Sequence, residues 1–278
     1  MWAEFIYCNL LRPWPLRPLA NWAIRALLPR QIQLGLATVV LNPRDPVVSG
    51  ALRLRVYERD EIQFFRETCK PGMTVLDVGA NLGCYTALAM HHVGETGRVI
   101  ALEPDPESFG YLQQTVAANT TTGARVECLN TAAAAAPGDL RLYLSTDNRG
   151  DNRVYAPGLN WPSVVVPAAP ADDLLEARGI LQVDLIKIDV QGAEGGVLAG
   201  LVRTLARSPR IVVLTEFWPQ GLRLAGTTPE SMLAALRAAG LHLHELAAGG
   251  KLQPLRADAA LIASLPGRKY TNLVAMKK

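Results

Sequence analysis

The sequence has little cysteine and no long apolar run. Its four cysteines form no CxxC pair among 278 residues, which argues against a structural zinc site and for a reducing compartment. No apolar run reaches the roughly 18 residues of a transmembrane helix, and no signal peptide is evident. We therefore expect a cytoplasmic protein.

The chain also lacks a strong excess of either charge. It has 28 Lys and Arg residues against 25 Asp and Glu residues, a formal net charge of +3, which is short of the basic footprint of a nucleic-acid-binding protein. Hydrophobic residues make up 49% of the sequence, enough for one large α/β domain with a substantial core. The composition thus predicts a single α/β domain and no nucleic-acid partner.

Residues 1–35 differ from the rest because aromatic and apolar residues are interleaved with arginines. Three of the five tryptophans lie there, and prolines divide the segment into two expected helices, about 2–11 and 19–28. Such a composition suits a membrane interface, whereas a cap on the main domain or a homodimer contact is the alternative that we favour. We expect a helical extension over residues 1–40 and the main domain over 41–278.

The rest of the chain is organised around a glycine turn that follows an apolar strand. Residues 74–78 predict the strand and residues 83–91 a helix, because apolar side chains recur there at helical spacing. Glycine permits positive φ and lets the backbone approach a ligand. Asp77, at the strand end, can accept a hydrogen bond from an ammonium or a hydroxyl. The turn itself contains Gly79, Ala80, Asn81 and Gly83.

A second strand, residues 98–102, ends in Glu103 and Pro104. An acid at this place can hold both hydroxyls of a ribose, as it does in dinucleotide-binding folds. A strand, a glycine turn, a helix and a strand ending in an acid predict a nucleoside-binding βαβ unit. A tight strand-to-helix turn without a ligand is the alternative.

Two later strands carry charged residues at or near their carboxyl ends. Residues 183–190 are a nearly continuous apolar run, typical of a buried parallel strand, and alternation places Lys187 and Asp189 on one face. Charges on a buried strand are costly unless they are paired or lie at its open end. Residues 211–217 predict another strand, with Glu216 near its end. Because open α/β sheets bind ligands at that edge, both acids are site candidates.

Further elements follow from apolar periodicity and turn signals. Residues 32–57 have a strand-like pattern. A polar, turn-forming loop begins at Asp147 and Asn148, and it either binds substrate or is simply solvated; the sequence favours neither interpretation. We expect helices over 61–68, 106–119, 191–205 and 229–239, a strand over 125–130, an inserted hairpin with strands at 140–144 and 164–166, and a closing pair of strands over 241–246 and 270–276.

The glycine turn resembles the first motif of class I S-adenosylmethionine-dependent methyltransferases, with Asn81 in place of a middle glycine. Together with residues 172–175, 186–194 and 272–275, it resembles the FkbM-type methyltransferases, which typically O-methylate sugars, polyketides and related metabolites. The resemblance covers about residues 45–278. Such proteins usually have Glu where this chain has Gln191, which puts any role for an acid there in doubt.

The resemblance implies a doubly wound, seven-stranded, mostly parallel sheet whose last strand is antiparallel. It also implies that the turn from Gly79 to Gly83 passes the methionine part of S-adenosylmethionine, that Asp77 faces this end and that Glu103 holds the ribose. It further implies that Asn130, Thr131 and Ala132 flank the adenine.

Methyl transfer to a hydroxyl requires alignment, desolvation and a proton acceptor. Asp189 is the candidate base, although orienting the cofactor or pairing with Lys187 are alternatives. Glu216 is the second candidate, and Lys187 is either a catalytic group or a buried ion-pair partner. Glu194 is a substrate contact or a helix-terminus acid, and Trp218 is a further substrate contact. Asp189 and Glu216 could hold Mg²⁺, but the sequence contains no complete metal site.

These observations predict an S-adenosylmethionine-dependent O-methyltransferase that acts on a hydroxyl of a sugar, a glycan intermediate or a secondary metabolite. An NAD(P)-dependent oxidoreductase would share the glycine turn and the acid, but Asn81 breaks its G-x-G-x-x-G spacing. A non-catalytic cofactor-binding protein is the third possibility, and it would tolerate the loss of Asp189 and Glu216.

Overall fold

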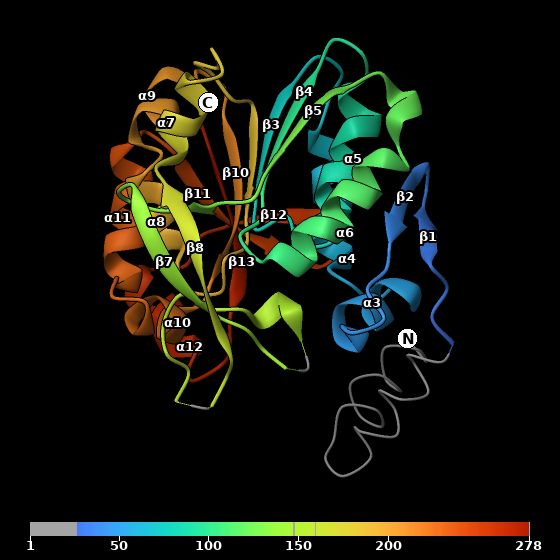
Figure 1. Ribbon diagram of the computed structural model, residues 1–278. Coiled ribbons are helices and arrows are strands. Elements are labelled where there is room, and N and C mark those ends of the chain that lie inside the picture. Colours follow the sequence, from blue (N-terminus) through green and yellow to red (C-terminus); the bar gives the residue numbers. More distant parts are fainter. Residues whose placement is uncertain (1–26, 147, 159, 278) are drawn as a thin grey trace.

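A large sheet forms the centre of the molecule (Figure 1). The computed structural model describes residues 27–146, 148–158 and 160–277. The strands of the large sheet are β3 (Thr74–Val78), β4 (Arg98–Leu102), β5 (Arg125–Leu129), β9 (Leu185–Ile188), β10 (Val212–Phe217), β11 (His242–Ala247), β12 (Lys251–Pro254) and β13 (Thr271–Met276). They lie in the order β12-β11-β13-β10-β9-β3-β4-β5.

The directions of these strands confirm the expected doubly wound topology. Strands β5, β4, β3, β9 and β10 run parallel to one another, whereas β13 runs antiparallel to both β10 and β11. Strand β12 pairs antiparallel with β11 and adds an eighth strand at the edge. All four residues of β12 are exposed, so it lacks the apolar alternation by which a strand is predicted.

Helices cover both faces of the sheet (Figure 1). One face carries α4 (Arg59–Thr68), α5 (Cys84–Val93) and α6 (Pro106–Ala117). The other carries α7 (Ala171–Glu176), α8 (Glu194–Ala199), α9 (Val202–Arg207), α10 (Pro219–Leu224), α11 (Pro229–Ala238) and α12 (Asp258–Ser264). Single 3₁₀ turns occur at η2 (Thr120–Thr122), η3 (Arg149–Asp151) and η4 (Ala248–Gly250).

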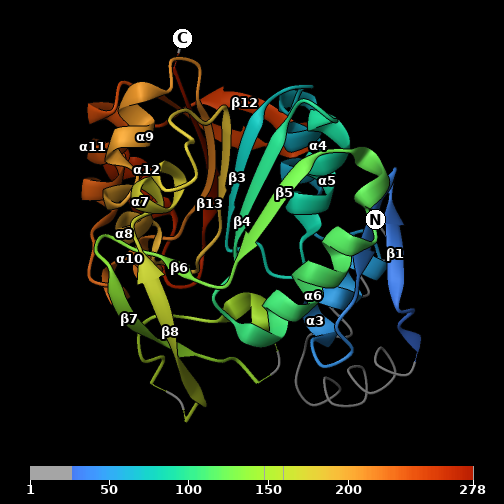
Figure 2. The ribbon, with the colours of Figure 1, turned by 45° about the horizontal axis from the view of Figure 1, so that its top comes forward.

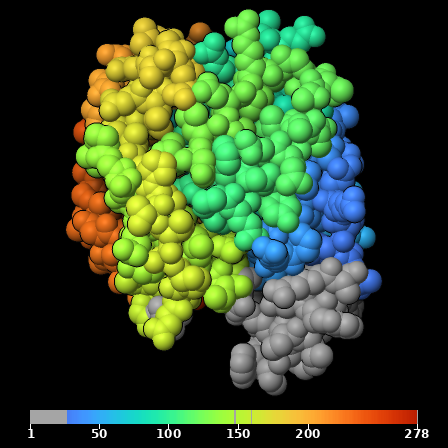
Figure 3. All heavy atoms as spheres, in the orientation of Figure 1, coloured from blue at the N-terminus to red at the C-terminus, as the bar shows by residue number. Residues whose placement is uncertain are grey.

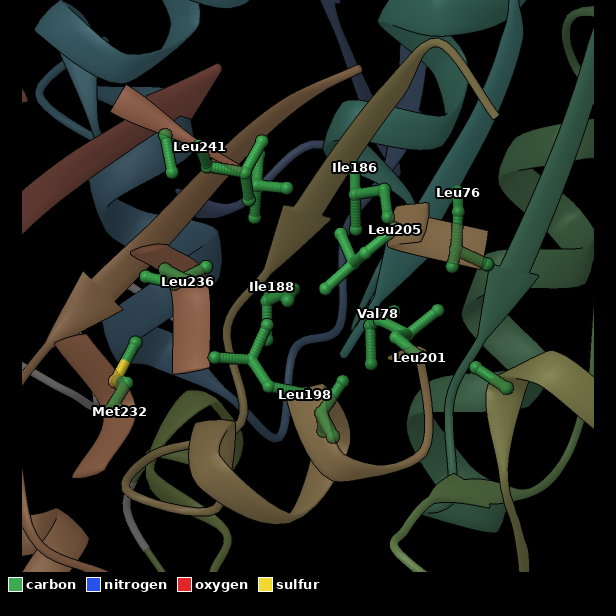
Figure 4. Packing of buried hydrophobic residues seen from close by; sticks show 14 of the residues in the cluster. Leu76, Val78, Ile186, Ile188, Leu198, Leu201, Leu205, Met232, Leu236 and Leu241 are labelled. Atoms are coloured by element: carbon green, nitrogen blue, oxygen red, sulfur yellow. The ribbon is translucent and has the colours of Figure 1, made fainter. Parts of the chain in front are cut away.

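Side chains of β9 alternate between the two cores, as expected for a strand buried on both faces. Leu185 packs in the cluster on the α5 side, and Ile186 and Ile188 pack in the larger cluster on the opposite side. Figure 4 shows this second cluster, in which Ile188 lies with Leu198 and Leu201. Lys187 therefore projects toward the α5 side, as the pattern predicts.

The prediction of one continuous helix over residues 191–205 was wrong. Gln191 and Gly192 have positive φ values of 53° and 102°, so the helix begins only at Glu194, and it breaks at Gly200–Leu201 into α8 and α9. Because an added Cβ at Gly200 would lie 2.2 Å from the Ala134 carbonyl oxygen, this break brings the chain close to the strand β6 (Ala132–Ala133).

The N-terminal part also departs from expectation. Residues 31–40 form a hairpin of β1 (Gln31–Leu34) and β2 (Ala37–Val40), which confirms the strand-like pattern from residue 32 but contradicts a helical extension that reaches residue 40. Within the strand-like stretch 32–57, the chain instead forms α3 (Pro46–Arg53). The Asp45 carboxylate accepts a hydrogen bond from the Val48 amide at 3.1 Å and Pro46 begins the helix, which is a recognisable helix-start signal. The helices expected over 2–11 and 19–28 fall almost wholly outside the described residues.

A three-stranded sheet, order β6-β8-β7, is inserted between β5 and β9 along the chain. Its antiparallel strands β7 (Gly138–Tyr143) and β8 (Ser163–Ala169) confirm the predicted hairpin. Figure 2 shows this insert extending past the end of β5, where the parallel strands terminate. In the described part of the chain, no helix is long and apolar enough to cross a membrane.

Candidate functional site

A cavity of about 840 Å³ lies at the carboxyl ends of β3, β4, β9 and β10. The insert forms one of its walls and the segment around α3 another; η3 contacts α3, and the two segments adjoin on the surface in Figure 3. The cavity lining contains these predicted site residues: Gly79, Asn81, Glu103, Pro104, Thr131, Ala132, Asn148, Lys187, Asp189, Glu216 and Trp218. The prediction at Asp147 lies outside the described residues.

The glycine turn joins the ends of three strands. Gly79 has φ +83°, and a Cβ there would lie only 2.0 Å from the carbonyl oxygen of Asp189. The backbone amide of Asn81 donates to Oε2 of Glu103 at 2.7 Å. Position 79 therefore requires glycine because the backbone after β9 occupies the place of a side chain.

Glu103 is held with its carboxyl group against the cavity. It is 6% exposed, and its Oε1 accepts a second backbone hydrogen bond, from Asp105, at 2.8 Å. Burial raises the pKa of Glu103 to about 8, although the two amide donors oppose this shift. Asn130 lies behind this acid, because its amide nitrogen donates to the carbonyl oxygens of Glu103 and Pro104 at 2.8 and 3.0 Å.

Three predicted residues of the turn region support it without lining the cavity. The Asp77 carboxylate accepts a hydrogen bond from the Thr86 hydroxyl of α5 at 2.6 Å, and burial raises the pKa of Asp77 to about 6. Gly83 donates to the Ala80 carbonyl at 2.8 Å. The acid expected to face the ligand is thus turned toward α5.

A buried lysine lies between two acids at the inner end of the cavity. Lys187 is 2% exposed, and its Nζ lies 3.7 Å from Oε2 of Glu58 and 3.8 Å from Oδ2 of Asp189. Burial alone would lower the pKa of the ammonium group, but Glu58 and Asp189 raise it overall. Lys187 therefore remains charged and fixes the position of Asp189.

Gln191 separates the two predicted catalytic acids. Its side-chain nitrogen donates to Oδ1 of Asp189 at 2.7 Å and to Oε2 of Glu216 at 3.3 Å. Burial, followed by repulsion from Asp189 and Glu194, raises the pKa of Glu216 well above its ordinary value. An amide at position 191 thus supplies a hydrogen-bond donor where a third acid would add repulsion.

Glu194 is fully buried and does not line the cavity. Its Oε1 accepts hydrogen bonds from the backbone amides of Val190 and Gly192, both at 3.2 Å, and burial raises its pKa to about 7. This geometry holds the turn after β9 and agrees with the helix-terminus interpretation rather than with a substrate contact.

Sequence reasoning missed Glu58, which lines the cavity beside Lys187. Its Oε2 accepts a hydrogen bond from the Tyr85 hydroxyl at 2.6 Å, and its backbone is left-handed, with φ 37° and ψ 51°. In the sequence Glu58 belongs to an ordinary charged run before a helix, so no local signal distinguishes it.

The part of the cavity lining beyond the end of β10 is aromatic, and we call it the aromatic wall. Trp161, Trp218 and Tyr270 line it, and the indole nitrogen of Trp218 donates to the Gly267 carbonyl at 2.8 Å. Behind the two tryptophans, the Arg153 guanidinium lies 5.4 and 5.1 Å from their ring centroids. Such cation–π contacts fix the rings in place.

Polar groups border the aromatic wall. Arg153 also pairs with Asp151 at 2.6 Å, and Arg268 pairs with the other oxygen of Asp151 at 2.8 Å. Asn148 lies elsewhere on the insert, beside the glycine turn: its Oδ1 accepts a hydrogen bond from the Gly150 amide at 3.1 Å, and a Cβ at Gly150 would lie 3.6 Å from Nδ2 of Asn81. Within the described residues, no group of three or more His, Cys, Asp or Glu side chains could hold a metal ion.

A family model, the methyltransferase FkbM domain, matches residues 77–243, more than half of the chain. The chain belongs to the FkbM methyltransferase family. It is 24% identical over 157 residues to the hexuronic acid methyltransferase AglP of Haloferax volcanii, a match that covers 56% of this chain and 61% of that protein. The chain therefore spans less than two thirds of the length of this curated relative.

Among solved structures, an FkbM methyltransferase from Methylobacillus flagellatus KT is 15% identical, with a TM-score of 0.46 and coverage of 99% of this chain and 60% of that one. An S-adenosylmethionine-dependent methyltransferase from Aquifex aeolicus is 20% identical, with a TM-score of 0.39 and coverage of 81% and 91%.

The family implies S-adenosylmethionine, and the cavity fits this cofactor. Asn81 Oδ1 is buried and has no hydrogen-bond partner among the described residues, which leaves an acceptor for a ligand donor. The missing side chain at Gly79 and the cavity-facing Glu103 provide a close backbone approach and a ribose acceptor.

Proposed function

We propose that the protein is an S-adenosylmethionine-dependent O-methyltransferase acting on a hydroxyl group of a sugar or glycan intermediate, with a secondary metabolite as the second acceptor class. One observation carries the proposal. A single cavity joins the glycine turn and Glu103 to the acids Asp189 and Glu216 and to an aromatic wall. Family membership supports methyl transfer, and the name of the Haloferax relative makes uronic acids a sugar class to test.

In this proposal the cofactor lies along the carboxyl edge from β4 toward β9. Glu103 accepts the two ribose hydroxyls, Thr131 and Ala132 flank the adenine with Pro104, and the turn at Asn81 passes the methionine part. Asp77, Ala80, Gly83 and Asn130 act indirectly by holding the turn and the strand ends. When bound, the cofactor supplies a methyl group activated by its sulfonium.

Asp189 is the proposed proton acceptor for the attacking hydroxyl. It lies at the cavity and is fixed by the Gln191 amide at 2.7 Å and by Lys187 at 3.8 Å. A carboxylate held in this way can take the hydroxyl proton as the oxygen attacks the methyl carbon. Glu216, whose pKa burial raises, is the second candidate for the same step.

The aromatic wall is the proposed acceptor site. Trp161, Trp218 and Tyr270 present flat apolar surface, while Arg268 and, from another part of the insert, Asn148 offer polar groups to the same cavity. Flat rings bordered by a few polar groups suit a sugar ring, which has apolar faces and a hydroxyl edge. Because Gln191 places a hydrogen-bond donor between Asp189 and Glu216, the proposal includes no Mg²⁺.

Residence in the cytoplasm, and membrane contact or dimerisation through residues 1–35, remain predictions from the sequence. Co-sedimentation of the full chain with anionic liposomes, compared with a Trp14→Ser, Trp22→Ser variant, tests the membrane contact. Equal co-sedimentation of the two proteins would contradict it.

The function is tested by transfer of a radiolabelled methyl group from S-adenosylmethionine to neutral and uronic-acid-containing oligosaccharides. We expect transfer to a saccharide, and Asp189→Asn should slow it by about 10²- to 10⁴-fold while binding of S-adenosylhomocysteine stays within a few-fold. Asp173→Asn, on the exposed first turn of α7, is the control. An Asp189→Asn protein as active as the control would refute the proton-acceptor role.

A further inference from the structure

The inner end of the cavity has more acids than cations, and these acids are partly or fully withdrawn from solvent: Glu58 and Asp189 have side chains 21% and 22% exposed, and Glu216 is 7% exposed. Glu58, Asp189 and Glu216 all line it, and Lys187 supplies one positive charge among them. Buried acids without enough counter-charge are costly unless they are protonated or a ligand brings the missing charge. This end of the cavity is therefore suited to a cationic group of a ligand.

Asp77, the acid that the glycine motif predicts as the partner of a ligand's cationic group, already has a hydrogen-bond partner within the protein. Asp77 is 1% exposed, accepts a hydrogen bond from Thr86 inside the fold at 2.6 Å, and does not line the cavity. A cationic group at this end must therefore be held by a different carboxylate.

Glu58 has the required position. It lines the cavity, and its Oε2 accepts a hydrogen bond from the Tyr85 hydroxyl and lies 3.7 Å from Lys187 Nζ, while Tyr57 also interacts with the carboxyl group. A ligand ammonium would add a further donor to this carboxylate. Its left-handed φ of 37° is costly for a residue with a side chain. Such strain is retained where the side chain must point in one direction.

The course of the proposed cofactor leads to Glu58. The ribose would be held by Glu103 at the end of β4, and the glycine turn follows β3, the next strand of the sheet. The amino-acid tail, which extends from the ribose, then continues past Gly79 toward β9, where Lys187 and Glu58 face each other at 3.7 Å.

We propose that Glu58 binds the α-ammonium group of the cofactor's methionine part. This inference rests on the proposed function, because it assumes S-adenosylmethionine in the cavity. Glu58 lies outside the segment that the family model matches, so the family comparison assigns it no role. If Glu58 served only as the counter-charge of Lys187, removing its charge would not affect the amino-acid part of the ligand.

Protonation of Glu58 gives the proposal a second signature. Burial raises the pKa of Glu58 to about 7, and an ammonium group nearby favours its ionised form. Binding should therefore release a proton below about pH 7. The titratable groups that interact with Glu58 are Tyr57, Glu61, Cys84, Tyr85, Lys187, Asp189, Glu216 and Tyr270.

Two ligands isolate the ammonium contact in a calorimetric titration. S-adenosylhomocysteine carries the amino-acid tail, whereas 5′-methylthioadenosine has the same nucleoside without it. Glu58→Gln should weaken S-adenosylhomocysteine about 10- to 100-fold and leave 5′-methylthioadenosine unchanged. Glu67→Gln, on the exposed side of α4, is the matched control. Unchanged affinity of Glu58→Gln for S-adenosylhomocysteine would overturn the proposal.

The wild-type protein provides a test that needs no variant. The ratio of its affinities for the two ligands should rise by up to about tenfold per pH unit between pH 5.5 and 7. Titration of Glu103 affects both ligands equally, since both carry the ribose, and cancels in the ratio. A ratio independent of pH would refute the assignment of Glu58. If the wild-type protein bound neither ligand, the proposed function itself would fail.

Discussion

The two halves of the cavity are built in different ways. Most of the cofactor half comes from one short stretch, residues 74–105, in which strand, turn, helix and strand follow one another, and Glu58, Thr131 and Ala132 complete it. The acceptor half is assembled from the insert, the end of β10 and the segment before β13, which lie far apart in the sequence. A site built from consecutive elements can be predicted from a local sequence pattern, whereas a site built by tertiary packing of distant segments cannot.

The halves also differ in what holds their side chains. In the cofactor half, backbone amides hold the carboxyl group of Glu103. In the acceptor half, side chains hold one another, as Arg153 does with Trp161, Trp218 and Asp151. Substitutions should therefore separate the halves: changes near the glycine turn should affect cofactor binding, and changes in the aromatic wall should affect the acceptor alone.

The largest effect is expected for Gly79→Ala. The new Cβ would collide with the Asp189 carbonyl oxygen at 2.0 Å in a backbone conformation of φ +83°. We predict that S-adenosylhomocysteine binding, measured by calorimetry, falls at least about 1,000-fold and that the unfolding free energy drops by about 2–4 kcal/mol. Gly94→Ala has a positive φ of +63° but open space around it. Because its ψ of −165° lies in a region essentially restricted to glycine, this control should lose about 1–3 kcal/mol of stability but keep full binding.

Glu103→Ala should have the next largest effect. Each hydrogen bond from a ribose hydroxyl to the carboxylate contributes about 1.5–3 kcal/mol, so the affinity for S-adenosylhomocysteine should fall about 100-fold or more. Glu127→Ala is the control, because this acid pairs with Arg178 on the outer surface. Equal affinities of the two variants would remove Glu103 from the cofactor site.

The pH dependence of stability should also reflect Glu103. Burial raises its pKa from the ordinary value of 4.5 to about 8, so the folded protein prefers the protonated acid. The resulting stability is fully present below about pH 4.5 and is lost as the pH rises through about 8. Without ligand, urea unfolding should give about 2 kcal/mol less stability at pH 8 than at pH 6 from this group. Glu103→Gln should lose that part of the slope, and an unchanged slope would contradict the pKa shift.

The smallest effect is expected for Trp161→Ala, which tests the acceptor half of the cavity. Loss of one stacking surface should raise the KM for a saccharide acceptor about five- to tenfold, equivalent to about 1–1.4 kcal/mol. Binding of S-adenosylhomocysteine should remain unchanged, because Trp161 belongs to the insert, where it packs on Arg153, and not to the strands and turn that hold the cofactor. A parallel loss of cofactor affinity would show that the halves are not independent.

Local patterns predicted most of the sheet. The strands at 74–78 and 98–102 agree with β3 and β4 residue for residue, because apolar runs bounded by turns are local signals. Helix α3 was missed, although Asp45 and Pro46 form a recognisable helix start, since its valines resemble a strand. At the break between α8 and α9, Gly200 lies against the Ala134 carbonyl next to β6, a contact that no window of sequence contains.

The site could be predicted from the sequence where its residues directly follow a strand. Gly79 and Glu103 follow their strands directly and line the cavity as expected. Glu58 was missed because its partner Lys187 lies in a distant strand. The role of Gln191 was also missed, because its value as a donor becomes visible only when Asp189 and Glu216 lie side by side. Trp161 was missed for the same reason, because its place in the cavity lining is created only by the tertiary fold.

The central claim, that this cavity binds S-adenosylmethionine, is tested most directly by calorimetric titration of the wild-type protein with S-adenosylhomocysteine and, separately, with NADH. The account predicts micromolar binding of S-adenosylhomocysteine and no binding of NADH. Binding of NADH alone would contradict the account and favour an oxidoreductase on the same α/β fold.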